Sequence, residues 1–254
     1  QRESVDWDFP VNALDVVLMG RYGRLGPFKR PNKSDKNIAM ACLEKVKMAP
    51  YAKRQISNLS GGQQQRVFLA RALAQESDLY LMDEPLSSLD AKLRSDLRIE
   101  LKSIQANSGA TLLYVTHDQI EAMTMATHVG VLDNGKLVQF GSPREIYENP
   151  VSIYAASRLG QPRINVLPAD IFGGAPDNAK TIGLRPEQIT QGDGEDSFVQ
   201  RVEHLGDQTR LHLLFKNQEL ITVTNAQSDL KNGDIVKIRP NNPFYFDASG
   251  ARVA

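Results

Sequence analysis

Two short segments of the sequence carry residue types that suit phosphate chemistry. Ser60-Gly61-Gly62 comes just before an apolar helical pattern that runs to Leu73. A helix that begins on such residues leaves several backbone N–H groups without acceptors at the positive end of its dipole. Such a site binds anions and suits phosphate best. The second segment is an apolar strand, residues 79–82, that ends in Asp83 and Glu84, so we expect two carboxylates at the edge of a sheet.

A histidine follows a second apolar strand. Residues 110–115 are apolar almost throughout and are followed by Thr116-His117-Asp118. Between the two strands, residues 85–90 lead into a helix with leucines along one stripe, and residues 107–109 end that helix. An Asp-Glu pair or a lone histidine is more often structural than catalytic, so the order of these segments has to carry the argument.

The elements that position these residues alternate between helices and strands. We expect helices over residues 11–19, 34–46 with Ser34 as N-cap, 60–75 and 119–126, and a hairpin over 129–138 on the Asn134-Gly135 turn. Apolar strands that alternate with helices predict a mostly parallel sheet covered on both faces. The fold class of this part is therefore α/β.

The pattern changes after residue 141. Residues 144–149 and 152–159 indicate two short helices, and the alternation becomes period two after Pro168. Strands are expected at residues 198–202, 210–215, 220–223 and 235–238. They predict a small all-β domain, barrel-like in form. An oligonucleotide-binding fold is the alternative, but slight acidity and the lack of an aromatic and basic face argue against it.

Composition excludes several classes of protein. Lys and Arg total 30 and Asp and Glu total 30, so the formal net charge is +0 and a nucleic-acid partner is not expected. A single cysteine, Cys42, excludes an internal disulfide framework. We find no membrane-spanning run and no signal-peptide pattern, which favours the cytosol.

A phosphate-binding loop is not found in the sequence. Such a loop needs Gly-Lys-Ser/Thr, and Gly135-Lys136 is followed by Leu137. The Gly20, Gly23, Gly26 spacing is interpreted as a turn-rich connector, and the basic residues around it, including Arg21, as a solvated face.

Four segments in a fixed order resemble the ABC-transporter ATPases. Leu59-Ser60-Gly61-Gly62-Gln63 is similar to the signature, residues 79–84 to the Walker B strand, Ser88-Leu89-Asp90 to the D-loop and Thr116-His117 to the H-loop. All four lie within about sixty residues, and chance agreement of their order and spacing is very improbable.

The C-terminal part also resembles a known accessory domain. Residues 181–187 and 202–206 are similar to the TOBE domain of sugar-type importer ATPases. The resemblance implies a truncated P-loop NTPase domain over residues 1–140, with a helical subdomain at about 1–75 and a Walker B to H-loop part at about 76–140. A helical linker over 141–160 and a TOBE-like β domain over 161–254 would follow.

The resemblance implies that two copies pair head to tail and enclose two ATP molecules. Leu59, Ser60, Gly61, Gly62 and Gln63 would then bind the nucleotide held by the partner copy, and the glycines would let the backbone approach the γ-phosphate. The D-loop residues Ser88, Leu89 and Asp90 would connect the two sites.

The catalytic roles are implied in the same way. Asp83 would hold Mg²⁺ through water, and Gln1 would match the Q-loop glutamine that contacts the same metal. Glu84 would orient or deprotonate the attacking water, and His117 would contact the γ-phosphate. ATP and Mg²⁺ are the cofactors that follow.

The expected protein is the energy-coupling ATPase of a bacterial importer. Its partners would be a second ATPase subunit, two membrane permease subunits and, indirectly, a periplasmic or extracellular binding protein, with no nucleic acid. It would lie peripherally on the cytoplasmic face of the inner membrane. A DNA-repair ATPase does not fit, because the β domain and the membrane-coupling arm have no place there.

The transported molecule and the completeness of the chain stay open. The β domain favours a sugar or polyol importer, whereas residues 5–23 resemble ATPases of manganese, zinc or iron importers. Without a phosphate loop, we expect a fragment that is inactive alone. A chimeric or non-catalytic remnant is the alternative.

Overall fold

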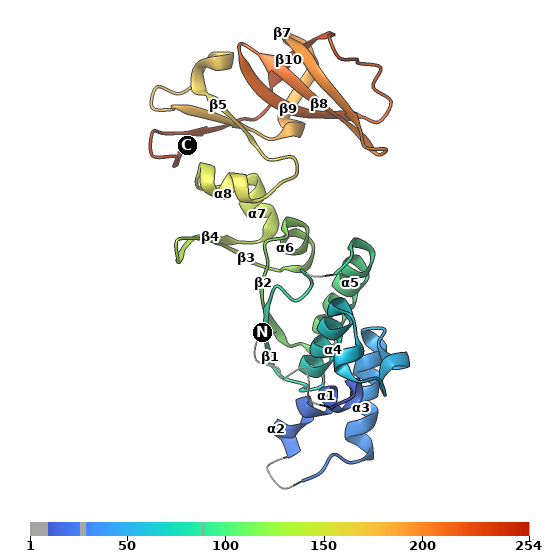
Figure 1. The fold of residues 1–254 in the computed structure, drawn as a ribbon. Coiled ribbons are helices and arrows are strands. Elements are labelled where there is room, and N and C mark those ends of the chain that lie inside the picture. The colour runs from blue at the N-terminus through green and yellow to red at the C-terminus, as the bar shows by residue number, and fades with distance from the viewer. Residues whose placement is uncertain (1–9, 26–28, 88, 254) are drawn as a thin grey trace. The chain divides into compact units, whose positions relative to one another are not determined.

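The computed structural model describes residues 10–25, 29–87 and 89–253 (Figure 1). Contacts divide the chain into two compact units, residues 1–118 and 119–254. None of the described helices is both long and apolar enough to cross a bilayer.

The first unit is mostly helical. Its helices are α1 (Ala13–Leu18), α2 (Tyr22–Leu25), α3 (Lys33–Lys45), α4 (Gly61–Leu73) and α5 (Ala91–Ser108), its 3-10 turns are Met19–Arg21, Ala49–Tyr51 and Ile56–Asn58, and its strands are β1 (Leu79–Asp83) and β2 (Thr111–Val115). Helices α1, α3 and α4 pack against one another, with Val17, Leu43 and Val67 buried between them. The predicted helices are confirmed.

Two local predictions in this unit are wrong. Helix α3 is capped by Asn32 rather than Ser34, because Asn32 and Asp35 each accept the other's backbone N–H at 3.0 Å. The predicted turn-rich connector is helical where the structure describes it, with Gly20 in a 3-10 turn and Gly23 in α2, while Gly26 lies outside the described residues.

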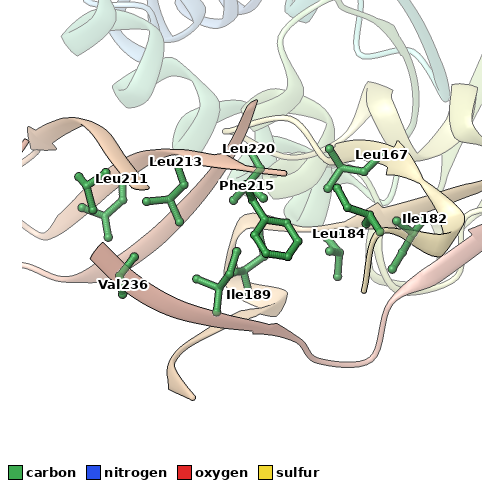
Figure 2. Packing of buried hydrophobic residues seen from close by; sticks show 12 residues of the cluster. Leu167, Ile182, Leu184, Ile189, Leu211, Leu213, Phe215, Leu220 and Val236 are labelled. Carbon is green, nitrogen blue, oxygen red and sulfur yellow. The ribbon is translucent and has the colours of Figure 1, made fainter. Parts of the chain in front are cut away.

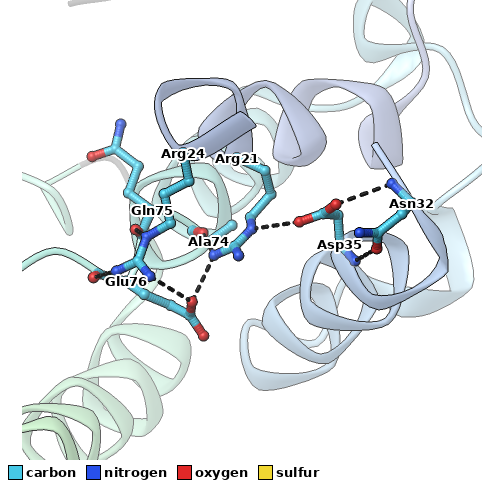
Figure 3. A network of polar contacts seen from close by, with 7 residues as sticks. All are labelled: Arg21, Arg24, Asn32, Asp35, Ala74, Gln75 and Glu76. Carbon is cyan, nitrogen blue, oxygen red and sulfur yellow. Dashed lines mark hydrogen bonds and ion pairs between the residues drawn. The ribbon is translucent and has the colours of Figure 1, made fainter. Parts of the chain in front are cut away.

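The end of α4 is held by a buried arginine, so the interpretation of Arg21 as part of a solvated face is wrong. Arg21 donates to Asp35 Oδ1 at 3.2 Å, to the carbonyl of Ala74 at 2.9 Å and to Glu76 Oε2 at 2.7 Å (Figure 3). Gly20 permits this approach, since a Cβ there would lie 2.2 Å from the Arg71 carbonyl oxygen. Arg21 thereby joins the first turn of α3 to the C-terminal end of α4.

Strands β1 and β2 are parallel, in a register that runs from Leu79 opposite Thr111 to Asp83 opposite Val115. Tyr80 and Met82 are buried on one face. The other face is exposed, with Leu81 at 71% and Leu113 at 60% exposure. The prediction of a sheet covered on both faces is therefore wrong for this pair, because the part of the chain that the structure describes leaves these apolar side chains exposed.

The second unit holds short helices and most of the strands. Its elements are α6 (Gln119–Met125), β3 (Val129–Asp133), β4 (Lys136–Gly141), α7 (Pro143–Glu148), α8 (Ile153–Arg158), β5 (Asn165–Pro168), a 3-10 turn Ala169–Phe172, β6 (Thr181–Leu184), a 3-10 turn Pro186–Gln188, β7 (Ile189–His204), β8 (Gln208–Phe215), β9 (Gln218–Asn225), β10 (Ile235–Pro240), β11 (Phe244–Phe246) and β12 (Arg252–Val253). The hairpin β3–β4 turns at Asn134-Gly135, both with positive φ, as predicted.

Strands β5 to β12 form the C-terminal β domain, which confirms the predicted all-β character. They make two four-stranded sheets in the orders β10-β7-β8-β9 and β12-β11-β6-β5. Figure 2 shows side chains of both sheets in one core, with Ile182 and Leu184 from one sheet and Leu213 and Phe215 from the other. Residues 119–160 belong to the same compact unit, and the domain boundaries at 140 and 160 stay a prediction.

Candidate functional site

The carboxyl ends of β1 and β2 bring a carboxylate and an imidazole together. Glu84 directly follows β1, and its N–H donates to the carbonyl of Val115 at 2.9 Å, which extends the parallel ladder by one bond. His117 lies two residues beyond β2. Its Nε2 lies 3.0 Å from Glu84 Oε1. Parallel strands that end at the same edge therefore place these two side chains next to each other.

Both side chains are accessible at this edge. The Glu84 side chain is 40% exposed and that of His117 is 88% exposed. Asp83, the last residue of β1, is also exposed. The Glu84 carboxylate, the His117 imidazole and the Asp83 carboxylate are thus all accessible to solvent near the ends of β1 and β2.

The backbone of Glu84 is held in an unusual conformation. Its φ is +43°, in the left-handed region, where a residue with a Cβ is strained by about 1–3 kcal/mol. Its carbonyl accepts from Ser87 Oγ at 3.0 Å and from Gln65 Nε2 at 3.3 Å. Gln65 also donates to the carbonyl of Pro85. These bonds fix the peptide that carries the carboxylate and stabilise its strained turn.

The Ser-Gly-Gly segment forms the first turn of α4. Ser60 is the N-cap, and its Oγ accepts from the Gln63 N–H at 3.4 Å, while Gln63 Oε1 accepts from the Ser60 N–H at 2.9 Å. The N–H groups of Gly61 and Gly62 lie in this turn and have no intrahelical acceptor. Ser60 is exposed and its hydroxyl can still donate, whereas Leu59 is buried at 5% exposure.

The segment after Glu84 leads into α5. Leu89 is buried at 5% exposure, and Asp90 caps α5, with its Oδ1 accepting from the Leu93 N–H at 2.9 Å. Helix capping thus accounts for the carboxylate of Asp90 without any ligand. Gln1 and Ser88 lie outside the described residues.

The donors at this edge fit a magnesium nucleotide better than a metal bound by protein alone. No group of three or more His, Cys, Asp or Glu in the described residues could hold a metal ion. Exposed carboxylate oxygens such as those of Asp83 suit Mg²⁺, which keeps several waters and usually takes its other ligands from phosphates. The accessible N-terminus of α4 is a separate site that suits an anion such as phosphate.

Sequence reasoning missed two residues that hold this site. Gln65 ties α4 to the backbone of Glu84, as described above. Arg94 on α5 pairs with Asp118 Oδ2 at 3.3 Å and donates to the carbonyl of Leu89 at 3.0 Å. It thereby joins the loop after Glu84 to the residue after His117. The only signal in the sequence was that Arg94 lies one turn after the cap residue Asp90.

Two family profiles match the sequence. The profile described as ABC transporter matches residues 10–87, and the profile described as TOBE domain matches residues 182–242.

Curated relatives are transporter ATP-binding proteins. The sn-glycerol-3-phosphate import ATP-binding protein UgpC of Jannaschia sp. (strain CCS1) is 40% identical over 218 residues, 78% of this chain and 62% of the relative. The protein of the same name from Rhizobium meliloti (strain 1021) is 37% identical over 241 residues, 86% of this chain and 68% of the relative. The xylose/arabinose import ATP-binding protein XacK of Haloferax volcanii is 40% identical over 212 residues, 71% of this chain and 55% of the relative. The chain thus spans between 55% and 68% of the length of these relatives.

A solved structure shares the fold. It is an ABC transporter in an inward-facing conformation, with a TM-score of 0.53 and 23% identity, covering 87% of this chain and 68% of that chain.

Proposed function

Because the chain belongs to the family of ABC transporter ATP-binding proteins, we propose that the full gene product hydrolyses Mg-ATP to drive an importer for a sugar or polyol. The contact of 3.0 Å between Glu84 and His117 supports this proposal most strongly. Residues 1–140 form part of the ATPase domain in this proposal, residues 141–160 the linker and residues 161–254 the TOBE domain.

Glu84 acts on the attacking water. Its carboxylate is half-exposed, and its strained peptide is held by Ser87 and Gln65, so it can orient the water or accept its proton. His117 donates a hydrogen bond to a γ-phosphate oxygen on the other side of that water. Asp83 would hold Mg²⁺, a hard cation that suits carboxylate oxygens. Bound Mg-ATP supplies the phosphoanhydride bond that is cleaved and the cation that offsets the phosphate charge.

The first turn of α4 acts on the nucleotide of a second copy. The hydroxyl of Ser60 and the N–H groups of Gly61 and Gly62 donate to the γ-phosphate there, with Leu59 and Gln63 fixing the shape of the turn. One such charge-stabilising donor lowers the activation barrier by about 3–4 kcal/mol. By the family resemblance, the D-loop residues Ser88, Leu89 and Asp90 would connect the two sites, and Gln1 would be the Q-loop ligand of the metal.

The proposed hydrolysis needs a phosphate-binding loop, and the sequence contains no Gly-Lys-Ser/Thr. That loop supplies a lysine and a backbone cradle for the phosphates. The 254-residue chain alone is therefore expected to show no ATPase activity.

The proposed importer ATPase has several protein partners. The protein pairs with a second ATPase subunit and with two membrane permease subunits at the cytoplasmic face of the membrane, and a binding protein delivers the transported molecule. The importers named for the relatives carry sn-glycerol-3-phosphate or xylose and arabinose, which supports a sugar or polyol. A manganese, zinc or iron importer is the less supported alternative.

The test is ATP turnover by the purified full gene product. We expect Mg²⁺-dependent hydrolysis that falls by about 10²–10⁴-fold in Glu84→Gln, because the general base is lost while its shape is kept. ATP binding should persist in this variant. Normal turnover by Glu84→Gln would refute the assigned role.

A non-catalytic scaffold that keeps the dimer face is the second candidate. It is favoured by the absence of Gly-Lys-Ser/Thr from the sequence. A full gene product that neither binds nor hydrolyses Mg-ATP, yet purifies with membrane subunits, would select this candidate.

A further inference from the structure

Arg185 is a charged side chain buried inside the second unit. It is 1% exposed and lies directly after β6. Its Nη1 donates to the carbonyl of Ala156 at 2.9 Å and to that of Leu159, and its Nη2 donates to the carbonyl of Tyr147 at 3.0 Å. One side chain of the β domain thus holds the backbone of two helices that precede this domain.

The acceptors are the carboxyl ends of these helices. Tyr147 lies in the last turn of α7, and Ala156 and Leu159 lie in the last turn of α8 and at its C-cap. Terminal carbonyls of a helix lack intrahelical donors and form the negative end of its dipole. The guanidinium satisfies three of them at once.

The ring of Tyr147 completes the surroundings of the cation. Arg185 Cζ lies 3.9 Å from the ring centroid, in cation–π geometry. The Tyr147 hydroxyl donates to Glu187 Oε1 at 2.6 Å. Burial, followed by this bond, raises the pKa of Tyr147 to about 12, so the hydroxyl remains a neutral donor. Burial lowers the pKa of Arg185, and the neighbouring Tyr147 and Glu187 oppose that effect.

A glycine leaves the space that the guanidinium needs. Gly160 follows α8 with φ +113°, and a Cβ on it would lie 2.9 Å from Arg185 Nη1 and 3.1 Å from the Tyr147 ring. Any other residue at position 160 would be strained and would push on the arginine.

The same two helices are also attached on other sides. Toward the chain terminus, the N–H of Ile153 donates to the carbonyl of Gly250 and that of Arg252 to the carbonyl of Val151, both at 2.9 Å. Toward the hairpin β3–β4, the Tyr154 hydroxyl donates to the carbonyl of Leu132 at 2.7 Å. An apolar cluster adds to this attachment; it consists of Val131, Ile146 and Leu159, with Met123, Val129, Tyr147 and Tyr154 beside it.

We propose that Arg185 is a positioning residue that fixes α7 and α8 to the β domain, so that the hairpin β3–β4 and the β domain move as one body. The consequence rests on the proposed function. A ligand or protein that engages the β domain can then act on α6, which begins two residues after His117.

Amide hydrogen exchange of the full gene product tests this proposal. In Arg185→Met, which keeps an unbranched apolar stem but removes the charge and the donors, we expect residues 143–159 to exchange about tenfold faster or more, since charged hydrogen bonds to carbonyls are lost. Strands β8 and β9 should keep their protection. Arg185→Lys should give an intermediate change, because it retains the charge but not the fork of donors.

The control is Arg239→Met, an exposed arginine of β10 whose Nε lies 3.6 Å from Asp193. It should leave residues 143–159 unchanged. Equal loss of protection throughout the β domain in Arg185→Met, or no change in residues 143–159, would overturn the proposal.

Gly160→Ala keeps the proposal testable if Arg185→Met does not fold. The added methyl group crowds Arg185 Nη1 without removing the charge, so the amides of residues 143–159 should again exchange faster. Unchanged exchange in Gly160→Ala would contradict the proposal. Exchange is measured without nucleotide, so this outcome does not depend on whether the protein hydrolyses ATP.

Discussion

Glu84 is positioned through its backbone rather than through its side chain. Its carbonyl accepts hydrogen bonds from Ser87 and Gln65, and its N–H donates to the carbonyl of Val115. Its carboxylate lies next to the exposed imidazole of His117. The strained backbone is thus fixed by three hydrogen-bond partners, while the carboxylate stays accessible. This combination is typical of a site where the side chain contacts a substrate.

The pairing of Glu84 with His117 could be expected from the sequence. Each residue follows an apolar strand, and parallel strands end at the same edge of a sheet. The roles of Gln65 and Arg94 could not be expected, because most of their partners are backbone carbonyls, which carry no signal in the sequence.

Arg94 should matter for turnover more than for nucleotide affinity. It joins Leu89 to Asp118, so Arg94→Met should loosen the loop after Glu84 and the loop of His117 together. We expect kcat of the full gene product to fall by about 10²-fold, the effect of a small misplacement, with little change in KM for ATP. Arg98→Met, one turn further along α5, is the matched control. An equal fall in both variants would argue against a positioning role.

At the scale of elements, α4 links the two ends of the helical region. Its N-terminus presents Ser60-Gly61-Gly62, and its C-terminal end is held by Arg21. The sequence predicted the helix, and the structure adds that Ser60 and Gln63 form a capping box at its start. The sequence could not predict that Arg21 is buried, because that depends on how closely the 3-10 turn at Gly20 approaches Arg71.

The N-cap of α3 is decided between two residues that both favour this position. Asn32 and Ser34 are both favourable N-cap residues. Asn32 has Asp35 three positions later, and the two close a reciprocal capping box. The reciprocal pair Asn32–Asp35 therefore decides where α3 begins.

Asp35 should make the helical region sensitive to acid. The N–H of Asn32 and then the Arg21 guanidinium hold the pKa of this carboxyl below its ordinary value of 3.8, and burial opposes them. Because the folded pKa is the lower one, the stabilisation is complete above the unfolded pKa and is lost as the pH falls through the folded pKa.

The measurement is the urea midpoint from neutral pH to about pH 3. Wild type should lose more stability over this range than Asp35→Asn, and the exposed control Asp78→Asn should follow the wild type. If Asp35→Asn follows the wild-type curve, the carboxylate does not stabilise this region.

At the scale of the whole molecule, the two units differ in how well they are covered. The β domain encloses a core between two sheets, whereas one face of β1–β2 leaves Leu81 and Leu113 exposed. Exposed apolar strands favour association with other copies. The sequence indicated the strands, but period and composition alone could not show that this face would be bare.

We therefore expect the 254-residue chain to associate at micromolar to millimolar concentrations. The double variant Leu81→Lys and Leu113→Lys should be more monomeric in analytical ultracentrifugation. The control is Ile99→Lys, at a residue of α5 that is 70% exposed, which should leave the degree of association nearly unchanged. If the chain stays monomeric at all concentrations, the exposed apolar face of β1–β2 does not mediate association.

The central claim is that Glu84 of one copy and the first turn of α4 of another act on the same nucleotide. Turnover by mixed dimers of the full gene product tests it most directly. Glu84→Gln and Gly62→Asp should each be inactive alone, the second because its carboxylate repels phosphate. When the two variants are mixed, half of the dimers contain one intact site, so turnover should recover to at most roughly a quarter of wild type. No recovery at any mixing ratio, with mixed dimers demonstrated, would contradict the account.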